Sequence, residues 1–454
     1  MAFQQGLSGL NASAKALDVV SNNIANAATV GFKGAQAHFS DLFASALSGG
    51  SSAQVGIGVK LGAVQQTFTQ GNITVSNNPL DIAINGNGFF RVQMSQADQS
   101  GYYTRNGQFH LDKNGLIVNS NGSILTGYMS YDGTTVDTAS VQPITLGTGG
   151  IPPKQTGWSS TVDPANSGLK LSVNLDNRDK KAVNVTDPNW TPLTPFAWDS
   201  TFSTGMYNYS TSATVYDQSG AAHTLTNYYV RQEDTGPGAR TWAVYTALDN
   251  KYMLTDTTNP PELVFQPNGV IQGLPSDYRF PLDMTQSTDI ETGAPVDLTT
   301  DLEWFDPAVT INLDMGESTQ YGSPNDTREI VQDGYGAGML TRVTVDEQGF
   351  VQGNYSNGQT KIMGQVILAE FRNPNGLQNV GNNLWVETNA SGQPLIGAPG
   401  AGTKGLLQSG AVEESNIDLT QELVNMITMQ RNYQANAQSI KTQDQILQTM
   451  VNLR

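Results

Sequence analysis

Apolar residues recur at alternating steps of four and three positions over residues 1–28, a spacing that predicts a helix with one apolar seam. Residues 418–454 show the same alternation and predict a second, longer helix, which Ser415 or Asp418 would cap. The first seam comprises Phe3, Leu7, Leu10, Ala14, Leu17, Ser21, Ile24 and Ala28. The second comprises Leu419, Leu423, Met426, Gln430, Tyr433, Ala437, Ile440, Asp444, Leu447 and Val451.

Between the two helices the pattern changes to short β-type runs separated by glycine and asparagine. Asn-Gly pairs stand at 85–86, 87–88, 106–107, 114–115 and 121–122, and this dipeptide is a strong hairpin signal. The sequence therefore predicts a mainly β protein with long α-helical termini that pair as a coiled coil, and with two β-rich domains between them.

The order of these elements predicts a nested domain organisation, because chain ends that meet allow one domain to be inserted into another. Residues 1–28 with 418–454 would form the helical domain, and 29–70 with 376–417 a connecting region. Residues 71–145 with 301–375 would form an inner β domain. Residues 146–300 would form an outer β domain inserted in the inner one.

Composition and charge narrow the function classes. The chain has no cysteine and three histidines, so we expect no thiolate chemistry, no metal site and no cofactor. The formal net charge is −17, which disfavours nucleic acid as a partner, yet residues 1–28 and 418–454 each sum to zero. Residues 283–347 hold 14 acidic against two basic side chains; this stretch would either bind divalent cations or form a solvated, repulsive surface, which we favour.

Helices with so few charges can pack beside copies of themselves without repulsion. We therefore expect them to contact other subunits rather than only each other. The stretch NNIANAATVGFK, residues 22–33, would be a hinge after the first helix, with a turn at Gly31 and with its asparagines bonding neighbouring subunits. The expected interface residues are Leu7, Leu10, Leu17, Asn22, Asn23, Ile24, Asn26, Gly31, Phe32, Leu423, Met426, Tyr433, Ile440, Leu447 and Val451.

Several long blocks resemble the bacterial flagellar rod and hook family. They are LDVVSNNIANAATVGFK at 17–33, LDIAINGNGFFRV at 80–92, YYTRNGQFHLDKNGLIVNSNGSILTGY at 102–128 and the stretch from Gly410 to Arg454. About 150 residues separate the two β halves, which favours the hook type over the shorter rod type. The resemblance implies a structural subunit without enzymatic activity that polymerises into a flexible tube joining rod to filament.

The resemblance also implies partners and a location. The partners would be further copies of the chain, rod, hook-cap and hook–filament junction proteins, and the flagellar type III export apparatus. The subunit would be extracellular, exported without a cleaved signal peptide, and without membrane insertion, because no run of about 18 apolar residues occurs. Two alternatives stay open: a distal rod-type subunit, and an extracellular β-rich adhesin or enzyme.

Overall fold

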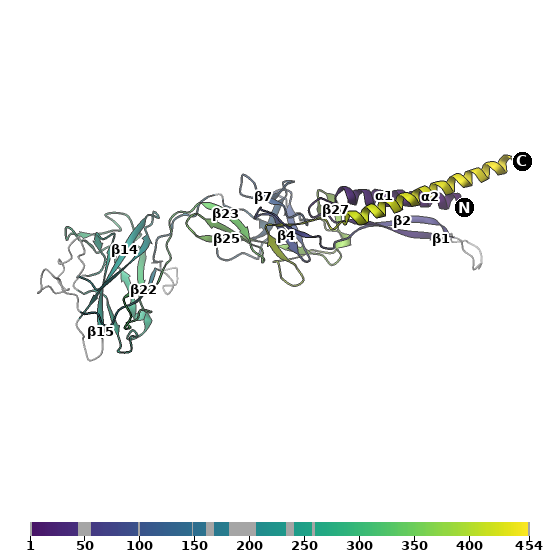
Figure 1. Cartoon of the computed structure of the whole chain (residues 1–454). Helices are drawn as coiled ribbons and strands as arrows, with labels where there is room; N and C mark the ends of the chain where they lie inside the picture. Colours follow the sequence, from purple (N-terminus) through teal and green to yellow (C-terminus); the bar gives the residue numbers. More distant parts are fainter. Residues whose placement is uncertain are drawn as a thin grey trace. The chain divides into compact units, whose positions relative to one another are not determined.

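The computed structural model describes residues 2–43, 56–98, 100–147, 149–159, 168–180, 206–232, 240–256 and 259–452. These residues are mostly β-strand, with one helix at each end of the chain (Figure 1). They form two compact units. The first unit comprises residues 1–149, 340–355 and 359–454, and the second comprises 150–339 and 356–358.

The two helices are close to their expected bounds. Helix α1 spans Ala2–Ala25 and ends three residues early. Beyond it, the amides of Ala27 and Thr29 donate to carbonyls three residues back, those of Ile24 and Asn26, at 3.2 and 3.0 Å, which are turn bonds rather than α-helical ones. Helix α2 spans Leu419–Asn452. The carboxylate of Asp418 caps it by accepting hydrogen bonds from the amides of Thr420 and Gln421 at 2.8 and 3.2 Å.

Strand pairing in the first unit joins the two halves of the chain. A two-stranded antiparallel ribbon, β1 (Ala35–Phe43) with β2 (Gly56–Gln66), follows α1. Two short pairs link early strands to strands that precede α2: β3 (Ile73–Val75) with β31 (Ala411–Glu413), and β4 (Ile82–Asn85) with β30 (Leu406–Ser409). Both ends of the chain are thereby attached to the same β framework.

A 13-stranded sheet forms the body of the first unit and draws on both halves of the sequence. Its turns include the expected ones at 114–115 and 121–122, where Gly115 and Gly122 have φ of +77° and +79°. Its core contains Phe90, Leu125 and Leu368, all fully buried. Its strands are β5 (Phe89–Gln93), β6 (Tyr102–Thr104), β7 (Phe109–Leu111), β8 (Ile117–Asn119), β9 (Ile124–Met129), β10 (Gln142–Pro143), β23 (Leu340–Val345), β24 (Phe350–Tyr355), β25 (Thr360–Val366), β26 (Leu368–Glu370), β27 (Gln378–Gly381), β28 (Leu384–Val386) and β29 (Leu395–Gly397).

The second unit has its own core between two sheets, around Trp242, Tyr229 and Phe305. The five-stranded sheet contains β11 (Trp158–Ser159), β12 (Leu169–Asn174), β18 (Arg279–Leu282), β21 (Val309–Asp314) and β22 (Asp326–Gln332). The seven-stranded sheet contains β13 (Tyr209–Tyr216), β14 (Ala222–Arg231), β15 (Arg240–Leu248), β16 (Tyr252–Met253), β17 (Glu262–Phe265), β19 (Ser287–Asp289) and β20 (Pro295–Val296).

Two expected borders differ from the observed units. Residues 301–339, expected in the inner domain, belong to the second unit because β21 and β22 both pair with β12. Residues 376–397, expected in a separate connecting region, supply β27, β28 and β29 to the 13-stranded sheet. Both borders depend on strand pairs whose members are more than a hundred residues apart in the sequence: β21 and β22 with β12, and β28 with β6. The local sequence pattern does not indicate such pairs.

Candidate assembly surface

The buried face of α1 lies one residue away from the predicted seam. Ser13, Ala16, Val20 and Asn23 are 8, 5, 9 and 2% exposed, and they are separated by three, four and three positions. The seam predicted from the apolar pattern has the same spacing, but each of its positions between Ala14 and Ile24 comes one residue later in the sequence. The helix therefore turns a stripe of mostly small residues inward.

Small residues allow α1 and α2 to approach closely. A Cβ atom at Gly6 would lie 3.0 Å from a side-chain carbon of Ile440, and one at Gly9 would lie 3.0 Å from the amide atoms of Asn436. The same amide donates to the hydroxyl of Ser13 at 3.4 Å. Larger side chains on this face of α1 would push the two helices apart.

The β1–β2 ribbon covers another side of α1. The amide of Gln5 donates to the carbonyl of Gly56 at 2.5 Å, and the backbone amide of Val59 donates to the hydroxyl of Ser8 at 3.3 Å. A helix held by α2 on one side and by this ribbon on another needs small or polar residues at both contacts. This double contact explains why the large apolar residues of α1 are not on its buried face.

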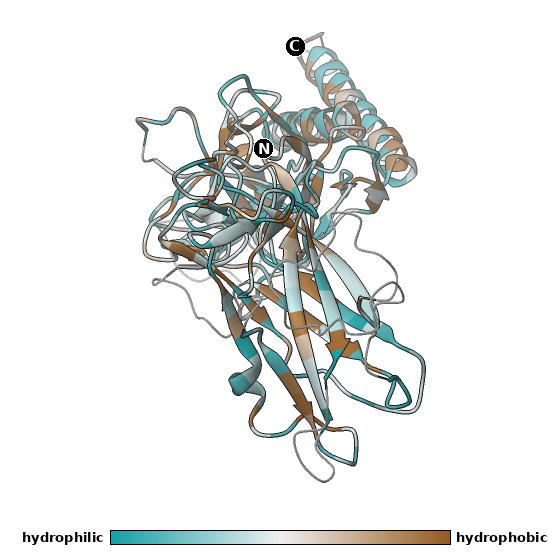
Figure 2. Ribbon diagram, turned by 90° about the vertical axis from the view of Figure 1, so that its left-hand side faces the viewer, coloured by the Kyte–Doolittle hydropathy of each residue, from teal (hydrophilic) through white to brown (hydrophobic). Residues whose placement is uncertain are grey.

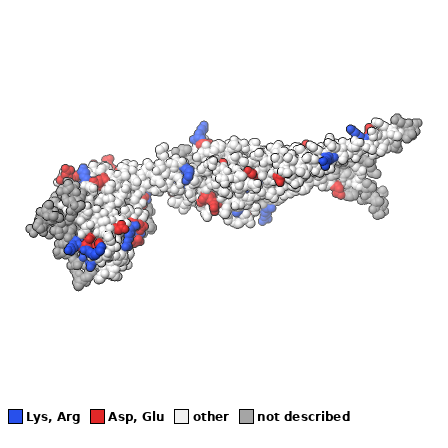
Figure 3. All heavy atoms as spheres, in the orientation of Figure 1, with Lys and Arg blue, Asp and Glu red and all other residues white. Residues whose placement is uncertain are grey.

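The large apolar residues of the predicted seams are therefore exposed or half-buried in the single chain. Leu7, Leu423, Tyr433, Leu447 and Val451 are 44, 45, 38, 49 and 73% exposed. The other predicted seam positions, Leu10, Leu17, Ile24, Met426 and Ile440, are half-buried. Brown and teal alternate along the exposed ribbon of α2 (Figure 2), and few charged atoms lie on the helical end seen in Figure 3.

Four further apolar residues of α2 are exposed although they are not among the expected interface residues. They are Leu419, Val424, Ile427 and Ile446, between 48 and 53% exposed. Leu419 was on the predicted seam but not among the expected interface residues. A strict four–three repeat selects a single narrow stripe, whereas α2 presents a broader apolar face. We call the exposed apolar side chains of α1 and α2 the outer apolar face.

The asparagines around Ile24 differ from the expectation that all three face other subunits. Asn23 is buried, and its amide both donates to and accepts from the backbone of Ala35, at 2.8 and 3.0 Å. The Asn26 amide bonds back to Asn22 at 2.9 and 3.2 Å, and only Asn22 is exposed. Asn23 therefore fastens the start of β1 to α1 within one chain, because an amide can pair with both polar groups of one residue.

Gly31 makes the expected turn, with φ of +69°. A Cβ atom there would lie 2.6 Å from the backbone nitrogen of Asn106, so a side chain is excluded by space as well as by conformation. Its amide donates to the carbonyl of Glu413 at 2.8 Å. Phe32, expected to anchor the next segment, is half-buried.

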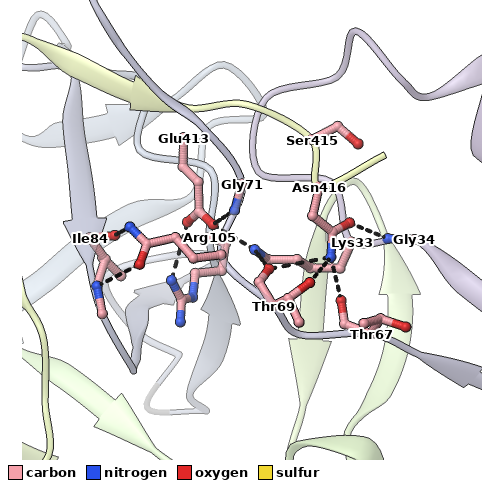
Figure 4. Close-up of polar contacts among 12 residues, drawn as sticks. Lys33, Gly34, Thr67, Thr69, Gly71, Ile84, Arg105, Glu413, Ser415 and Asn416 are labelled. Atoms are coloured by element: carbon pink, nitrogen blue, oxygen red, sulfur yellow. Dashed lines mark hydrogen bonds and ion pairs between the residues drawn. The ribbon is translucent and has the colours of Figure 1, made fainter. Parts of the chain in front are cut away.

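The following lysine forms a buried ion cluster that the sequence did not suggest (Figure 4). The Nζ atom of Lys33 lies 2.6 Å from Oε1 of Glu413, and a guanidinium nitrogen of Arg105 lies 3.1 Å from Oε2. The amide of Gly71 donates to the same Oε1 at 3.0 Å, and Lys33 also donates to the carbonyl of Thr69 at 2.8 Å. We call Lys33, Arg105 and Glu413 the anchor cluster.

The anchor cluster is buried, and it joins two cationic side chains to one anionic side chain. The side chains of Lys33 and Glu413 are fully buried and that of Arg105 is 4% exposed. Burial lowers the pKa of Lys33 below its ordinary value, and the charge of Glu413 opposes this shift. Arg105 has its pKa lowered by the same cause, and its guanidinium also lies 5.2 Å from the centre of the Phe89 ring.

The cluster joins segments that are far apart in the chain. Lys33 follows α1, Glu413 ends β31 shortly before α2, and Arg105 follows β6 of the large sheet. Each helix is thus connected, within eight residues of its end, to one buried carboxylate. An isolated lysine or glutamate is usually solvated, so no sequence signal distinguished these two.

Among the described residues, the acidic segment holds no group of three metal-ligating side chains. It instead carries surface pairs such as Lys170 with Glu317 and Glu329, at 2.9 and 3.2 Å. Of the histidines, His223 is buried between Asp217 and Asp249, whereas His38 and His110 are exposed. Neither described helix is apolar enough over its length to cross a bilayer.

Comparison with known families matches this architecture along most of the chain. Residues 3–33 match the model described as flagella basal body rod protein, and residues 408–453 match the flagellar basal body rod FlgEFG protein C-terminal model. Residues 83–151 match the flagellar hook protein FlgE/F/G D1 domain, and 174–335 match the flagellar basal body protein FlaE D2 domain. These matches define a flagellar axial protein of the rod and hook class.

Full-length relatives narrow the class to one family. The chain is 41% identical to the flagellar hook protein FlgE of Salmonella typhimurium and 40% identical to that of Escherichia coli, over all of both chains. It is 31% identical to FlgE of Borreliella burgdorferi over 99% of this chain and 98% of that one. The chain belongs to the flagellar hook protein family. A solved structure of Helicobacter pylori FlgE2 is 15% identical, with a TM-score of 0.48, over 74% of this chain and 99% of that chain.

Proposed function

We propose that the chain is the structural subunit of a bacterial flagellar hook and polymerises into a flexible helical tube that transmits torque from rod to filament. The observation that carries the proposal is the outer apolar face. Large apolar side chains on both helices are exposed in the single chain, while small residues occupy the contact between the helices. Exposed apolar surface of this extent is typical of a surface that other subunits cover.

In the proposed tube, α1 and α2 pair as a coiled coil and form the inner layer. The expected interface residues Leu7, Leu10, Leu17, Ile24, Leu423, Met426, Tyr433, Ile440, Leu447 and Val451 contact neighbouring copies in this proposal. Asn22 stays among them because it is exposed, whereas Asn23 is reassigned to bonding within the chain.

The connecting segments, residues 29–70 and those just before α2, transmit force between the helices and the β units in this proposal. The anchor cluster supports this role, because it connects both segments to the large sheet at one carboxylate. The β units form the outer shell. Polar, glycine- and asparagine-rich surfaces suit a tube that bends as it rotates, because hydrogen bonds to water or to alternate neighbours exchange at low net free energy.

The proposed partners are further copies of this chain, rod proteins, a hook cap, hook–filament junction proteins and the type III export apparatus. The proposed location is the extracellular hook. A structural role needs no catalytic group, and the proposal includes none. A distal rod subunit is less well supported, because the region from 174 to 335 matches a model described as a D2 domain and full-length relatives carry the hook name.

Truncation tests the proposal directly. A chain lacking residues 1–28 and 418–454 retains the anchor cluster, so we expect it to be folded, monomeric and unable to form tubes. Far-UV circular dichroism, sedimentation and electron microscopy under conditions that polymerise the full chain provide the readouts. Tubes formed by the truncated chain would contradict the proposal.

A further inference from the structure

A polar pocket lies at the start of α2, on the side that faces the end of α1. Its volume is about 200 Å³, and Asn23, Thr69, Asn416 and Glu422 are among the residues that line it. Its walls come from the end of α1, from the residues at one end of the β1–β2 ribbon, from the segment before α2 and from the first turn of α2. The pocket is open to solvent on one side in the single chain.

Two asparagine amides in the wall are already used within the chain. Asn23 is paired with the backbone of Ala35, as described above. The amide of Asn416 donates to the carbonyl of Thr67 at 2.7 Å and accepts from the backbone amide of Gly34 at 2.8 Å. These groups therefore shape the pocket but offer little to an incoming ligand.

The carboxylate of Glu422 is the exception. Among the described residues, its Oε2 atom is one of the few buried side-chain oxygens without a hydrogen-bond partner. A carboxylate oxygen removed from water without a partner is unfavourable, so such an atom calls for a specific donor. A cation is the donor that best compensates the charge.

No cation of the same chain is paired with Glu422 among the described ion pairs. Lys33 is engaged with Glu413, and Lys15 with Asp18 at 3.2 Å. Arg431 is exposed and has no ion pair within the described part of the chain. It follows Glu422 by nine residues, about two and a half helical turns, so the two side chains lie on opposite faces of α2.

We propose that the pocket receives Arg431 from a second copy of this chain, which forms an ion pair with Glu422. The two groups have opposite charge, and neither has an ion-pair partner among the residues that the structure describes. Their positions on opposite faces of α2 prevent them from pairing with each other. A contact between different surfaces of identical subunits leaves one free donor and one free acceptor, and so repeats into an open helical array. The planar guanidinium suits a carboxylate, because its N–H groups can pair with both carboxylate oxygens.

This inference rests on the proposed polymerisation and specifies one of its contacts. The test measures the critical concentration for tube formation of the full chain by sedimentation, at a fixed concentration of precipitant. Glu422→Gln and Arg431→Gln should each raise it roughly tenfold, because each leaves one member of a partly buried pair alone. The double variant should be no worse than either single variant, since both remove the same contact.

Charge exchange supplies the sharper test. Glu422→Arg and Arg431→Glu should each prevent assembly, and their combination should restore tubes. Asp444→Asn, also on α2 but outside the pocket, serves as the matched control and should assemble as the wild type does. Far-UV circular dichroism of each monomer establishes that α2 still forms.

The outcomes separate this contact from the broader function. A wild-type chain that forms no tubes would refute the proposed polymerisation. Wild-type tubes together with unchanged critical concentrations for both glutamine variants would refute the ion pair alone. Additive effects of the two substitutions in the double variant would refute a direct pair between Glu422 and Arg431. If Lys60→Gln or Lys441→Gln raised the critical concentration as much as Glu422→Gln, and Arg431→Gln did not, the partner of Glu422 would be that lysine and not Arg431.

Discussion

Replacing Glu413 by glutamine removes the only negative charge of the anchor cluster and keeps the size of the side chain. Lys33 and Arg105 would then remain buried as two cations without a counter-charge. Removing one member of a buried ion pair typically costs about 3–5 kcal/mol, because the remaining charge stays desolvated. We expect a loss in this range for local opening of the segments that meet at Glu413.

Hydrogen exchange followed by mass spectrometry measures this loss at the site itself. The amides of Gly31 and Gly71 both donate to Glu413, one to its carbonyl and one to its carboxylate. A loss of about 3–5 kcal/mol corresponds to exchange roughly 10²- to 10³-fold faster or more, at one factor of ten per 1.4 kcal/mol. Peptides covering residues 29–35, 69–75 and 409–415 should all show it in the monomeric chain.

Two matched variants separate charge from position. Glu414→Gln changes the adjacent residue, which is exposed, and should leave exchange unchanged. Lys33→Met removes the excess cation and leaves the Arg105–Glu413 pair, so its effect should be smaller than that of Glu413→Gln. Exchange in Glu413→Gln that equals the wild-type rate would refute the view that this carboxylate fastens both helices to the sheet.

Four further outcomes follow from the same geometry. Leu423→Asp should abolish tube formation in sedimentation while leaving the monomer's circular dichroism unchanged, because it places a charge on the outer apolar face. Gly9→Leu should lower the thermal stability of the helices, since a Cβ there already meets Asn436 at 3.0 Å. Gly31→Ala should cost more than about 2 kcal/mol in local exchange, from the left-handed φ and the contact with a backbone nitrogen. Because the pKa of Lys33 is lowered on folding, wild-type stability relative to Lys33→Met should rise as pH increases from that lowered pKa toward 10.5, which urea unfolding at several pH values checks.

The sequence predicted the elements better than their faces. Both terminal helices are present, and Asp418 caps α2 as one of the two expected residues. The predicted seam of α1 lies one residue away from its buried stripe. The apolar pattern marks the positions of the largest side chains, whereas the close contact with α2 requires the smallest ones. Small residues such as Gly9 and Ser13 do repeat at steps of three and four, and that second stripe was the available signal.

Long-range pairing accounts for what the sequence did not predict. Lys33 and Glu413 are 380 residues apart, and each by itself resembles an ordinary surface charge. Residues 301–339 were assigned to the inner domain from their position in the chain, but their strands pair with β12. In both cases a partner distant in sequence determines burial or domain membership, and no local pattern encodes that partner.

We expect other subunits to cover the outer apolar face, and not the contact between α1 and α2. The chain has no cysteine, so single cysteines introduced at Leu423, on the outer face, and at Ala16, on the buried face, can be labelled without background. The rate of thiol labelling in monomers and in assembled tubes is the measurement. Leu423→Cys should react rapidly in monomers and slowly in tubes, while Ala16→Cys should react slowly in both. A Leu423→Cys thiol that reacts equally fast in tubes and in monomers would contradict this expectation.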